Sequence, residues 1–518
     1  MTDQKQRTLN ALAKGAGITA IGMAVSKALT YLFRVIVARF LGPEAYGQVE
    51  LALMVAGFAG TVSLMALNSS LKKFIPEFRV NDEKAKIKGI VLSSLHLTIP
   101  LSLLATVVIF LSADFIAVEI FNNPALIPLI QVVAFKPLFG NMANIYLGTT
   151  IGYNKIFYKT LTRKIIQNIV QLLVATGLII LNFGVLGAAW GSLAGTVVAA
   201  VLGLYYMEKK VGPILTSSVE AVYQHKKILM YSSPLVVSAT ISTIMGWADT
   251  ALLGYLMSDF EVGIYNTALP TALLILLPHK AIGSLAITSF SELKERSEEE
   301  VEKSLQAATY WVYALVFPTF LIMLLFSEQV LNVLWGSQYT QASLALSILA
   351  VGYLIDATAG RTGSLLSAKG RTNYILYNNI AAVTLNVGLN IALIPIYGIM
   401  GAAIATAAST ILTNILMFIE LWKKENIISI PKNKVLKITL VGLTPLILVA
   451  GLNNLLFIET PYWFIFPAGL LYYGLYILIF LKVLGLGEEE KEVFLRIGEI
   501  IGYREEVEAS LEFIEDKL

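Results

Sequence analysis

Ionisable side chains inside long apolar stretches are the groups of this sequence best placed to do chemistry. Lys27, Arg34, Lys136, Lys280 and Arg361 all lie in such stretches. A charged group inside a bilayer costs at least ~2.5–3.5 kcal/mol on insertion scales, so it usually faces a water-filled cavity or a partner. Arginine binds phosphate oxygens through a planar fork, and lysine binds them as a point charge. The five cations therefore predict a cavity for an anionic headgroup.

The same residues also have interpretations that need no substrate. Arg34 and Arg361 could run along the apolar surface and place their charges at the membrane interface. Asp356 could pair with Arg361 and hold two helices together. His279, which precedes Lys280, could be a packing residue.

Asp249 is the only carboxylate in its apolar stretch and predicts a second site. Asn386 and Asn390 are four residues apart, so they share one helix face. Together with Thr406 or Thr410 they would surround Asp249 with oxygen atoms, which suits a hard cation such as sodium. Sodium or a proton bound at this carboxylate would couple transport to an ion gradient.

Two further considerations concern Asp249. In an internal repeat described below, it lies within one residue of the position equivalent to Arg34. This predicts opposite charges at one depth in the two halves, whose attraction would change when an ion binds. The alternative is a purely structural carboxylate that accepts hydrogen bonds from neighbours such as Ser242 or Thr243.

Composition places these residues in a membrane protein. The 518 residues are 56% hydrophobic and 14% charged, with a mean hydropathy of +0.72. The chain has no cysteine, which excludes disulfides and thiolate metal sites. It contains no phosphate-binding Gly-Lys-Ser/Thr loop, and its three histidines lack metal-ligand spacing. We therefore expect no cofactor other than a coupling sodium ion or proton, and no nucleic-acid partner.

The apolar stretches predict an all-α integral membrane protein with about fourteen transmembrane helices, each near the length that a bilayer requires. The predicted ranges are 15–39, 47–71, 88–112, 125–150, 162–182, 185–207, 228–257, 262–289, 306–327, 341–367, 374–395, 398–422, 435–456 and 462–484. The acidic segment 486–518 carries apolar residues at helical spacing, which predicts an amphipathic cytosolic tail.

Lysine and arginine gather in alternate connections between the predicted helices. By the positive-inside rule, this places both termini on the cytoplasmic side of the cell membrane. Arg39, at the outer end of the first helix, is the main exception. The cations assigned to cytoplasmic connections include Lys72, Lys73, Lys84, Lys155, Lys159, Arg163, Lys164, Lys209, Lys210, Lys369, Arg371, Lys423 and Lys424.

One short motif occurs twice. Phe183-Gly-Val-Leu-Gly-Ala-Ala-Trp190 returns as Tyr397-Gly-Ile-Met-Gly-Ala-Ala-Ile404, 214 residues later, and Leu41–Gly47 has a weaker echo in Met257–Gly263. Six predicted helices separate the copies, so both have the same orientation and a pseudo-twofold axis along the membrane normal. We predict two parallel six-helix lobes, 1–210 and 211–425, followed by two additional helices in 426–485. Small residues in the motif would let helices approach closely.

The segment Tyr31-Leu-Phe-Arg-Val-Ile-Val-Ala-Arg-Phe-Leu-Gly-Pro-Glu-Ala-Tyr-Gly47 resembles the first-helix signature of the polysaccharide-transport family. This family belongs to the multidrug/oligosaccharidyl-lipid/polysaccharide exporter superfamily. The resemblance also covers Gly148–Lys155, Ser367–Arg371 and both Gly-Ala-Ala motifs, within about residues 10–425.

The resemblance implies a flippase that moves an isoprenoid-(pyro)phosphate-linked oligosaccharide to the outer leaflet by alternating access, for polysaccharide or glycoprotein assembly. Membrane lipids and glycan-assembly enzymes would be its other partners. Similarity to the lipid II flippases of the superfamily implies that a sodium site is formed by the carboxylate of the seventh helix with polar groups of the eleventh and twelfth. It also implies a groove for the lipid tail beside the last two helices.

Three other functions compete with this interpretation. A multidrug/cation antiporter of the same superfamily would favour carboxylates and aromatic residues over cations in its cavity. A membrane glycan polymerase or ligase would need a large outer loop, whereas every predicted outer loop is short, so we expect no enzyme. A structural scaffold would not need charged residues in the middle of the membrane.

Overall fold

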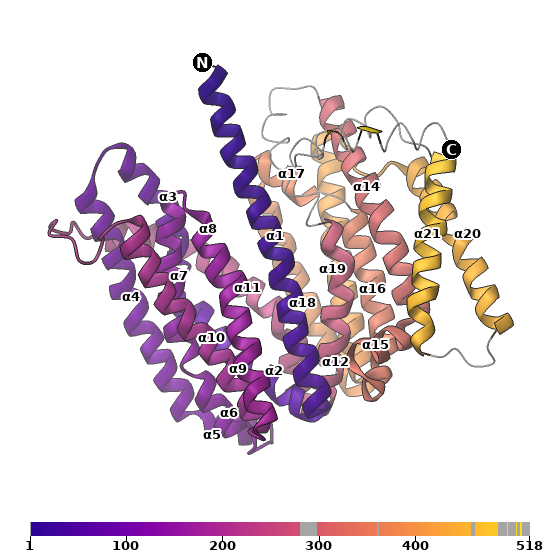
Figure 1. Ribbon diagram of the computed structural model, residues 1–518, viewed down its shortest axis with the longest axis horizontal. Coiled ribbons are helices and arrows are strands. Elements are labelled where there is room, and N and C mark those ends of the chain that lie inside the picture. Colours follow the sequence, from indigo (N-terminus) through magenta and orange to yellow (C-terminus); the bar gives the residue numbers. More distant parts are fainter. Residues whose placement is uncertain are drawn as a thin grey trace.

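The computed structural model describes residues 2–279, 298–359, 362–456 and 462–484, with the isolated residues 495, 504, 508 and 509. Within these ranges the chain is helical apart from short connections (Figure 1). The α-helices are α1 (Thr2–Leu41), α2 (Pro43–Leu64), α3 (Leu67–Val80), α4 (Lys84–Leu111), α5 (Ala113–Phe115), α6 (Leu126–Val133), α7 (Lys136–Gly152), α8 (Ile156–Lys159), α9 (Gln167–Ile180), α10 (Gly184–Tyr206), α11 (His225–Leu256), α12 (Asp259–Ala272), α14 (Glu298–Leu325), α15 (Ser327–Trp335), α16 (Ser343–Thr358), α17 (Thr362–Ala368), α18 (Thr372–Tyr397), α19 (Ile399–Glu425), α20 (Lys432–Leu456) and α21 (Ile465–Leu484).

Short π-helical and 3₁₀ segments extend or interrupt these helices. The π-helical segments are η1 (Ile116–Ile120), η2 (Thr160–Ile166) and η3 (Met207–Val211). The 3₁₀ segments are η4 (Leu273–Leu276), η6 (Ser337–Ala342) and η7 (Tyr462–Phe464). Of these, η2 and η6 position residues of the sites described below.

In the described part of the chain, eleven helices are long and apolar enough to cross a membrane. They are Pro43–Val80, Lys84–Leu111, Leu126–Gly152, Ile156–Ile180, Gly184–Val211, His225–Leu256, Asp259–His279, Glu299–Leu325, Ser337–Thr358, Thr372–Tyr397 and Ile399–Glu425. Each overlaps one predicted span, and the other three predicted spans coincide with α1, α20 and α21. The prediction of an all-α membrane protein is confirmed, whereas the total of fourteen spans stays a prediction.

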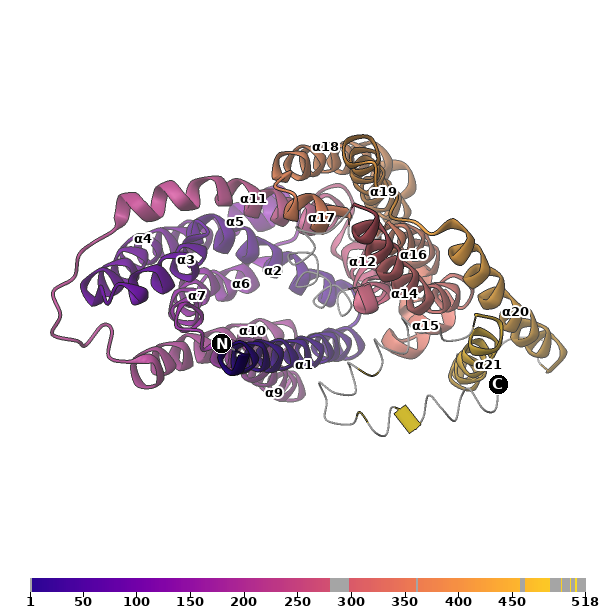
Figure 2. The ribbon, with the colours of Figure 1, turned by 90° about the horizontal axis from the view of Figure 1, so that it is seen from above.

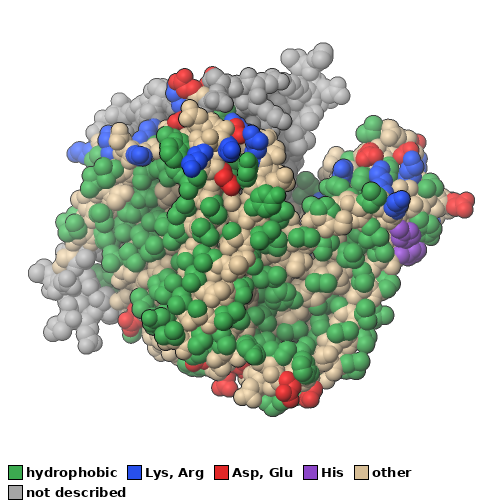
Figure 3. Space-filling model, turned by 180° about the vertical axis from the view of Figure 1, so that it is seen from behind, with side chains coloured by type: hydrophobic (Ala, Val, Ile, Leu, Met, Phe, Trp, Pro, Cys, Tyr) green, Lys and Arg blue, Asp and Glu red, His purple; other side chains and the backbone are tan. Residues whose placement is uncertain are grey.

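The surface has the charge pattern of a protein that spans a membrane. Figure 3 shows a broad apolar belt between one rim rich in Lys and Arg and an opposite rim with Asp and Glu. We call these the basic rim and the acidic rim. The basic rim lies at the end of the molecule that carries α17, and the acidic rim lies at the end that carries α5 (Figure 1). A notch separates the two halves of the molecule at the basic rim.

The helices form two groups that lie side by side in both ribbon views (Figures 1 and 2). One group holds α1 to α10, and the other holds α12 to α19. The helices α20 and α21 pack on each other and on α14, at the end of the second group that is farthest from the first (Figure 2).

Helix α11 connects the two groups along its length. Its Ser232 hydroxyl lies 2.7 Å from that of Ser70 in α3, and its Thr243 hydroxyl lies 3.0 Å from that of Thr61 in α2. Further along, Asp249 of α11 bonds residues of α18 and α19. The first half of α11 therefore packs on the first group, and its second half contacts both groups.

The repeated motif adopts the same local structure in both copies. Gly184 and Gly398 have φ of 54° and 55°, in the left-handed region that favours glycine, and a helix begins at each motif. A Cβ atom on Gly187 would lie 3.0 Å from Ile179 N, and one on Gly401 would lie 2.5 Å from Leu393 O. The motif therefore packs each helix against the one before it, as the small residues predict.

Candidate functional site

A cavity of about 400 Å³ lies among the helices of the first group. It is lined by α1, α2, α7, η2, α9 and α10, and Trp247 of α11 completes its wall. Along α2 the lining extends from Leu53 to Leu64, the end of the helix nearer the basic rim. Its polar side chains are Arg34, Lys136, Arg163, Asn141, Asn144, Gln167, Gln171, Ser192, Thr30, Thr61 and Thr196. We call it the cationic cavity.

Arg34 reaches the cationic cavity from α1 and is paired with a carboxylate of its own group. Its Nη2 donates a 3.0 Å hydrogen bond to Oε2 of Glu50 in α2. The Arg34 side chain is 24% exposed, whereas that of Glu50 is fully buried. Arg34 therefore meets the cavity without extending to the membrane interface.

Lys136 lies where one membrane span is broken. The α6 helix ends at Val133 and α7 begins at Lys136, and Pro137 follows, whose missing N–H cannot continue a helical hydrogen-bond ladder. The break turns the Lys136 side chain toward α10, where its Nζ donates a 2.5 Å hydrogen bond to Ser192 Oγ. The ammonium group thus reaches the cavity wall in the middle of the span Leu126–Gly152.

Arg163 was predicted to lie in a cytoplasmic connection, and this was wrong. It belongs to η2, a π-helical segment that continues directly into α9, and π-helical turns often mark functional positions because they redirect side chains. Its guanidinium donates hydrogen bonds to Gly140 O at 2.8 Å, Asn144 Oδ1 at 2.7 Å and Gln167 Oε1 at 3.0 Å. The guanidinium is a third cation of the cationic cavity.

The remaining predicted cations lie elsewhere. Lys27 is exposed on α1 and does not line the cavity. It precedes Arg34 by seven residues, about two helical turns, so both residues project from one face of α1. Lys280 and Arg361 lie outside the described residues, as does most of the predicted tail. Asp356, proposed as a partner of Arg361, accepts a 2.9 Å hydrogen bond from Asn414.

The structure brings Asp249, Asn386, Asn390 and Thr406 together in the second group. Asn390 Nδ2 donates to Asp249 Oδ1 at 2.8 Å, and Asn386 Nδ2 approaches the same atom at 3.4 Å. Thr406 Oγ1 donates to Oδ2 at 2.5 Å, and Tyr265 donates its hydroxyl to the same oxygen. Asp249 is 4% exposed, so this cluster is a buried carboxylate joined to α12, α18 and α19.

The cluster has the oxygen atoms that a monovalent cation would need. It contains one carboxylate, and a hydroxyl oxygen can coordinate a cation with its lone pairs as well as donate a hydrogen bond. Asn390 Oδ1 is buried and has no hydrogen-bond partner. Rotation of the two amides would turn Oδ1 atoms toward Asp249, so the residues fit a sodium ion as well as a proton.

Three residues predicted as neighbours of Asp249 have other hydrogen-bond partners in the structure. Ser242 and Thr243 do not bond Asp249, because their hydroxyls donate to the backbone of their own helix, at Ser238 O and Ala239 O. Thr410 contributes only its carbonyl, which accepts from Asn414. Arg34 and Asp249 do not contact each other, although an attraction between them was predicted. Arg34 pairs with Glu50 of α2, whereas Asp249 accepts hydrogen bonds from uncharged side chains of α12, α18 and α19.

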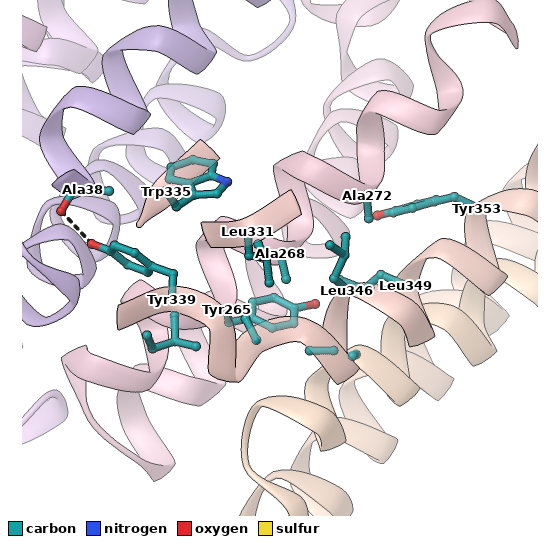
Figure 4. Packing of buried hydrophobic residues seen from close by; sticks show 14 of the residues in the cluster. Ala38, Tyr265, Ala268, Ala272, Leu331, Trp335, Tyr339, Leu346, Leu349 and Tyr353 are labelled. Atoms are coloured by element: carbon teal, nitrogen blue, oxygen red, sulfur yellow. Dashed lines mark hydrogen bonds between the residues drawn. The ribbon is translucent and has the colours of Figure 1, made fainter. Parts of the chain in front are cut away.

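The two groups of helices are sealed together near the acidic rim. Tyr339 of η6 donates a 2.7 Å hydrogen bond to Ala38 O of α1 (Figure 4). The Trp335 indole donates to Thr271 at 2.9 Å, and its ring contacts Tyr31 with centroids 5.1 Å apart. Arg39, the exception to the positive-inside pattern, donates to Leu334 O at 3.1 Å and also to Val333 O, at the C-terminal end of α15. We call these contacts the outer seal.

The closest contact of the outer seal is made by two glycines at equivalent repeat positions. A Cβ atom on Gly47 of α2 would lie 1.8 Å from Asp259 O of α12, and one on Gly263 of α12 would lie 1.9 Å from Pro43 O of α2. The two contacts are reciprocal, as at a twofold axis. Only glycine allows the backbones of α2 and α12 to approach this closely.

Comparison with known sequences identifies the family. Residues 36–344 match the profile of the family described as polysaccharide biosynthesis protein, which is more than half of the chain. The chain belongs to this family. It is 30% identical over 226 residues to a probable low-salt glycan biosynthesis flippase of Haloferax volcanii, a match that spans 43% of this chain and 46% of that protein. It is 23% identical over 415 residues to a lipopolysaccharide biosynthesis protein of Escherichia coli strain K12, covering 78% of each.

Solved structures of this superfamily share the fold. The lipid II flippase MurJ in an inward closed conformation superposes with a TM-score of 0.73 at 16% identity, over 89% of this chain and 98% of that one. A multidrug resistance transporter in an inward-facing conformation gives 0.64 at 17% identity, over 79% of this chain and 98% of that one. The family match confirms the predicted resemblance to polysaccharide-transport proteins, and these structures show that the fold is shared.

Two functional candidates escaped the sequence analysis. Glu50 interrupts an apolar stretch, and the rule that selected Arg34 would have selected it too. Tyr265 carries no such signal, because a tyrosine in an apolar helix is usually a packing residue. Only the folded structure, which packs α12 beside α11, shows that its hydroxyl meets Asp249.

Proposed function

We propose that this protein is a flippase for an oligosaccharide linked to an isoprenoid through phosphate or pyrophosphate. The observation that carries the proposal is the cationic cavity, where Arg34, Lys136 and Arg163 converge and Glu50, paired with Arg34, is the single neighbouring carboxylate among the described residues. A surplus of positive charge in a membrane cavity favours an anionic ligand. The names of the relatives in glycan assembly support the same class of substrate.

The amide and hydroxyl groups of the cavity suit the first sugars of such a substrate. Asn144, Gln167 and Gln171 line the wall beside the three cations. Lys27 projects from the same face of α1 as Arg34, two turns nearer the basic rim, where it would attract the headgroup as it enters. The isoprenoid chain would pack against the apolar surface of α20 and α21, the last two helices.

Transport would proceed by alternating access between two lobes related by a pseudo-twofold axis. The matching motif glycines and the reciprocal contact of Gly47 and Gly263 support this symmetry. With the outer seal closed and a notch at the basic rim, the molecule has the form of an inward-facing state (Figure 3). The basic rim lies on the cytoplasmic side of the cell membrane by the positive-inside rule, and with it both termini.

Asp249 would couple this cycle to a sodium or proton gradient. Its partners belong to α12, α18 and α19, so a change of charge at Asp249 alters the contacts that hold α11 to the second group. Since α11 also packs on the first group, these contacts bias the relative position of the lobes. A ligand shifts such an equilibrium only through its different affinity for the two states.

The alternative is a multidrug/cation antiporter, whose fold the chain shares. Three converging cations disfavour this alternative because they repel a cationic drug. The test is calorimetric binding of farnesyl pyrophosphate, farnesol and tetraphenylphosphonium to the purified protein. We expect binding of the pyrophosphate only, at least about tenfold weaker (~1.4 kcal/mol) in Lys136→Ala and Arg163→Ala. The exposed Lys226→Ala is the control, and preferential binding of the phosphonium would favour the antiporter.

A further inference from the structure

The pair of Arg34 and Glu50 has an unusual feature for a buried ion pair. Oε2 of Glu50 accepts from Arg34 at 3.0 Å, but Oε1 is buried and has no hydrogen-bond partner. The Tyr46 hydroxyl also interacts with the Glu50 side chain, but it donates to Asn266 O at 3.1 Å. A buried carboxylate oxygen without a donor is costly, so the ion pair with Arg34 is a main support of the Glu50 carboxylate.

Among the described residues, three charged or titratable groups interact with Glu50 directly. They are Arg34 of α1, Tyr46 of α2 itself, and Lys136 of α7, whose ammonium group is bound to Ser192 in α10. Arg163 of η2, held by three oxygen acceptors, interacts with Lys136. Tyr339 of η6, which donates to Ala38 O, interacts with Tyr46.

Arg34 is the member of this pair that can meet a ligand. Its side chain is partly exposed and lines the cationic cavity, whereas Glu50 is fully buried behind it. A phosphate group that enters the cavity therefore competes with Glu50 for the same guanidinium. Phosphate has more acceptor oxygens than one carboxylate and binds arginine in bidentate fashion.

We propose that Glu50 is a built-in competitor of the substrate phosphate for Arg34, and that it takes up one proton when the phosphate displaces it. The proposal rests on the proposed function. In the step, the Arg34–Glu50 hydrogen bond breaks, Arg34 donates to a phosphate oxygen instead, and one proton from the buffered solution, which reaches the site through the cavity, adds to the Glu50 carboxylate. No covalent bond of the substrate changes. The protonated carboxyl group is neutral and can remain buried.

This arrangement has two consequences for transport. In the absence of substrate, Glu50 occupies Arg34, so weakly bound anions such as chloride or a single phosphate ester compete poorly. When the headgroup leaves, Glu50 recovers Arg34 and loses its proton, which favours release. Substrate affinity is thereby linked to pH through Glu50, independently of the ion site at Asp249.

The test is titration calorimetry of farnesyl pyrophosphate binding to the full-length protein in two buffers of different ionisation enthalpy. Wild type should take up one proton more than Glu50→Gln, and its affinity should fall as the pH rises, by at most about tenfold per pH unit. Glu50→Gln should bind more tightly than wild type at high pH, with a flatter dependence. Glu50→Asp should keep the proton uptake, and so should Glu77→Gln, which alters an exposed carboxylate paired with Lys227 at 3.0 Å.

Two results would overturn the inference, and a third would contradict the proposed function as well. The inference is refuted if wild-type protein binds farnesyl pyrophosphate without net proton uptake, after correction for protons that the ligand itself exchanges. This result needs no variant. Equal uptake by wild type and Glu50→Gln assigns the proton to another group and refutes it as well. Wild type that does not bind farnesyl pyrophosphate at all contradicts the proposed function itself.

Discussion

Replacement of Gly47 by alanine should open the outer seal. The added Cβ would lie 1.8 Å from Asp259 O and 2.9 Å from Gly263 N, and both are backbone atoms that no side-chain rotation can move. Helices α2 and α12 would have to separate by more than about 1 Å to reach an ordinary contact distance. The methyl group meets no such obstacle once the two helices have moved apart.

The magnitude follows from the cost of overpacking. Inserting a methyl group into a closely packed site typically costs about 1–3 kcal/mol. If this cost falls on the sealed state alone, the ratio of outward-open to sealed molecules rises about 5- to 150-fold. Gly263→Ala should have a similar effect, because its Cβ would lie 1.9 Å from Pro43 O.

The assay is a distance measurement across the seal. The chain has no cysteine, so spin labels can be attached at Glu44→Cys in α2 and Gln338→Cys in η6, both exposed near the outer seal. Double electron–electron resonance should show one short distance in the parent and a second, longer one in Gly47→Ala. Gly177→Ala is the control, because a Cβ at this exposed glycine of α9 has no atom within 4 Å. A single short distance in Gly47→Ala, with folding intact, would refute the reasoning.

Three further predictions concern the ion site and the seal. Asp249→Asn should abolish the dependence of transport on sodium or proton gradients in reconstituted vesicles while farnesyl pyrophosphate binding persists, and unchanged gradient dependence would make Asp249 a packing residue. If sodium is the coupling ion, Asn386→Ala should weaken the response to a sodium gradient in the same assay. A variant that loses only the response to a proton gradient would exclude sodium as the coupling ion. Arg39→Gln removes the charge-assisted bonds to Leu334 O and Val333 O, and because Arg39 is exposed we expect a loss of about 1 kcal/mol, seen as a several-fold larger open population in the spin-label assay. An unchanged distance distribution would show that Arg39 does not hold the seal.

The architecture was predictable because it follows from properties that are local in sequence. Each apolar stretch is long enough to form a span by itself, so the helices of the described part of the chain follow from the sequence. The two motif glycines also act locally, through left-handed φ values and contact with the preceding helix. The grouping of Asn386 with Asn390 follows from helical spacing alone.

The candidate site was only partly predictable because it depends on local irregularities and on distant contacts. The π-helical turn that carries Arg163 into the cavity has no signal of its own in the sequence. Arg163 and its basic neighbours look like a cluster of cations at the membrane interface. The pairing of Arg34 with Glu50 depends on how α1 packs against α2. The outer seal joins residues about 300 positions apart, such as Ala38 and Tyr339, whose contact no periodicity encodes.

The most direct test of the central claim is a flipping measurement on the wild-type protein. Vesicles containing the purified protein would be prepared with a fluorescent polyprenyl-pyrophosphate-linked oligosaccharide in both leaflets, and a membrane-impermeant reductant would bleach the exposed label. Without protein, only the outer-leaflet fraction should be lost. We predict that the protein exposes the inner-leaflet fraction as well, and that Lys136→Ala protein does not. Bleaching confined to the outer leaflet in wild-type vesicles, with correctly inserted protein and every gradient supplied, would contradict the account.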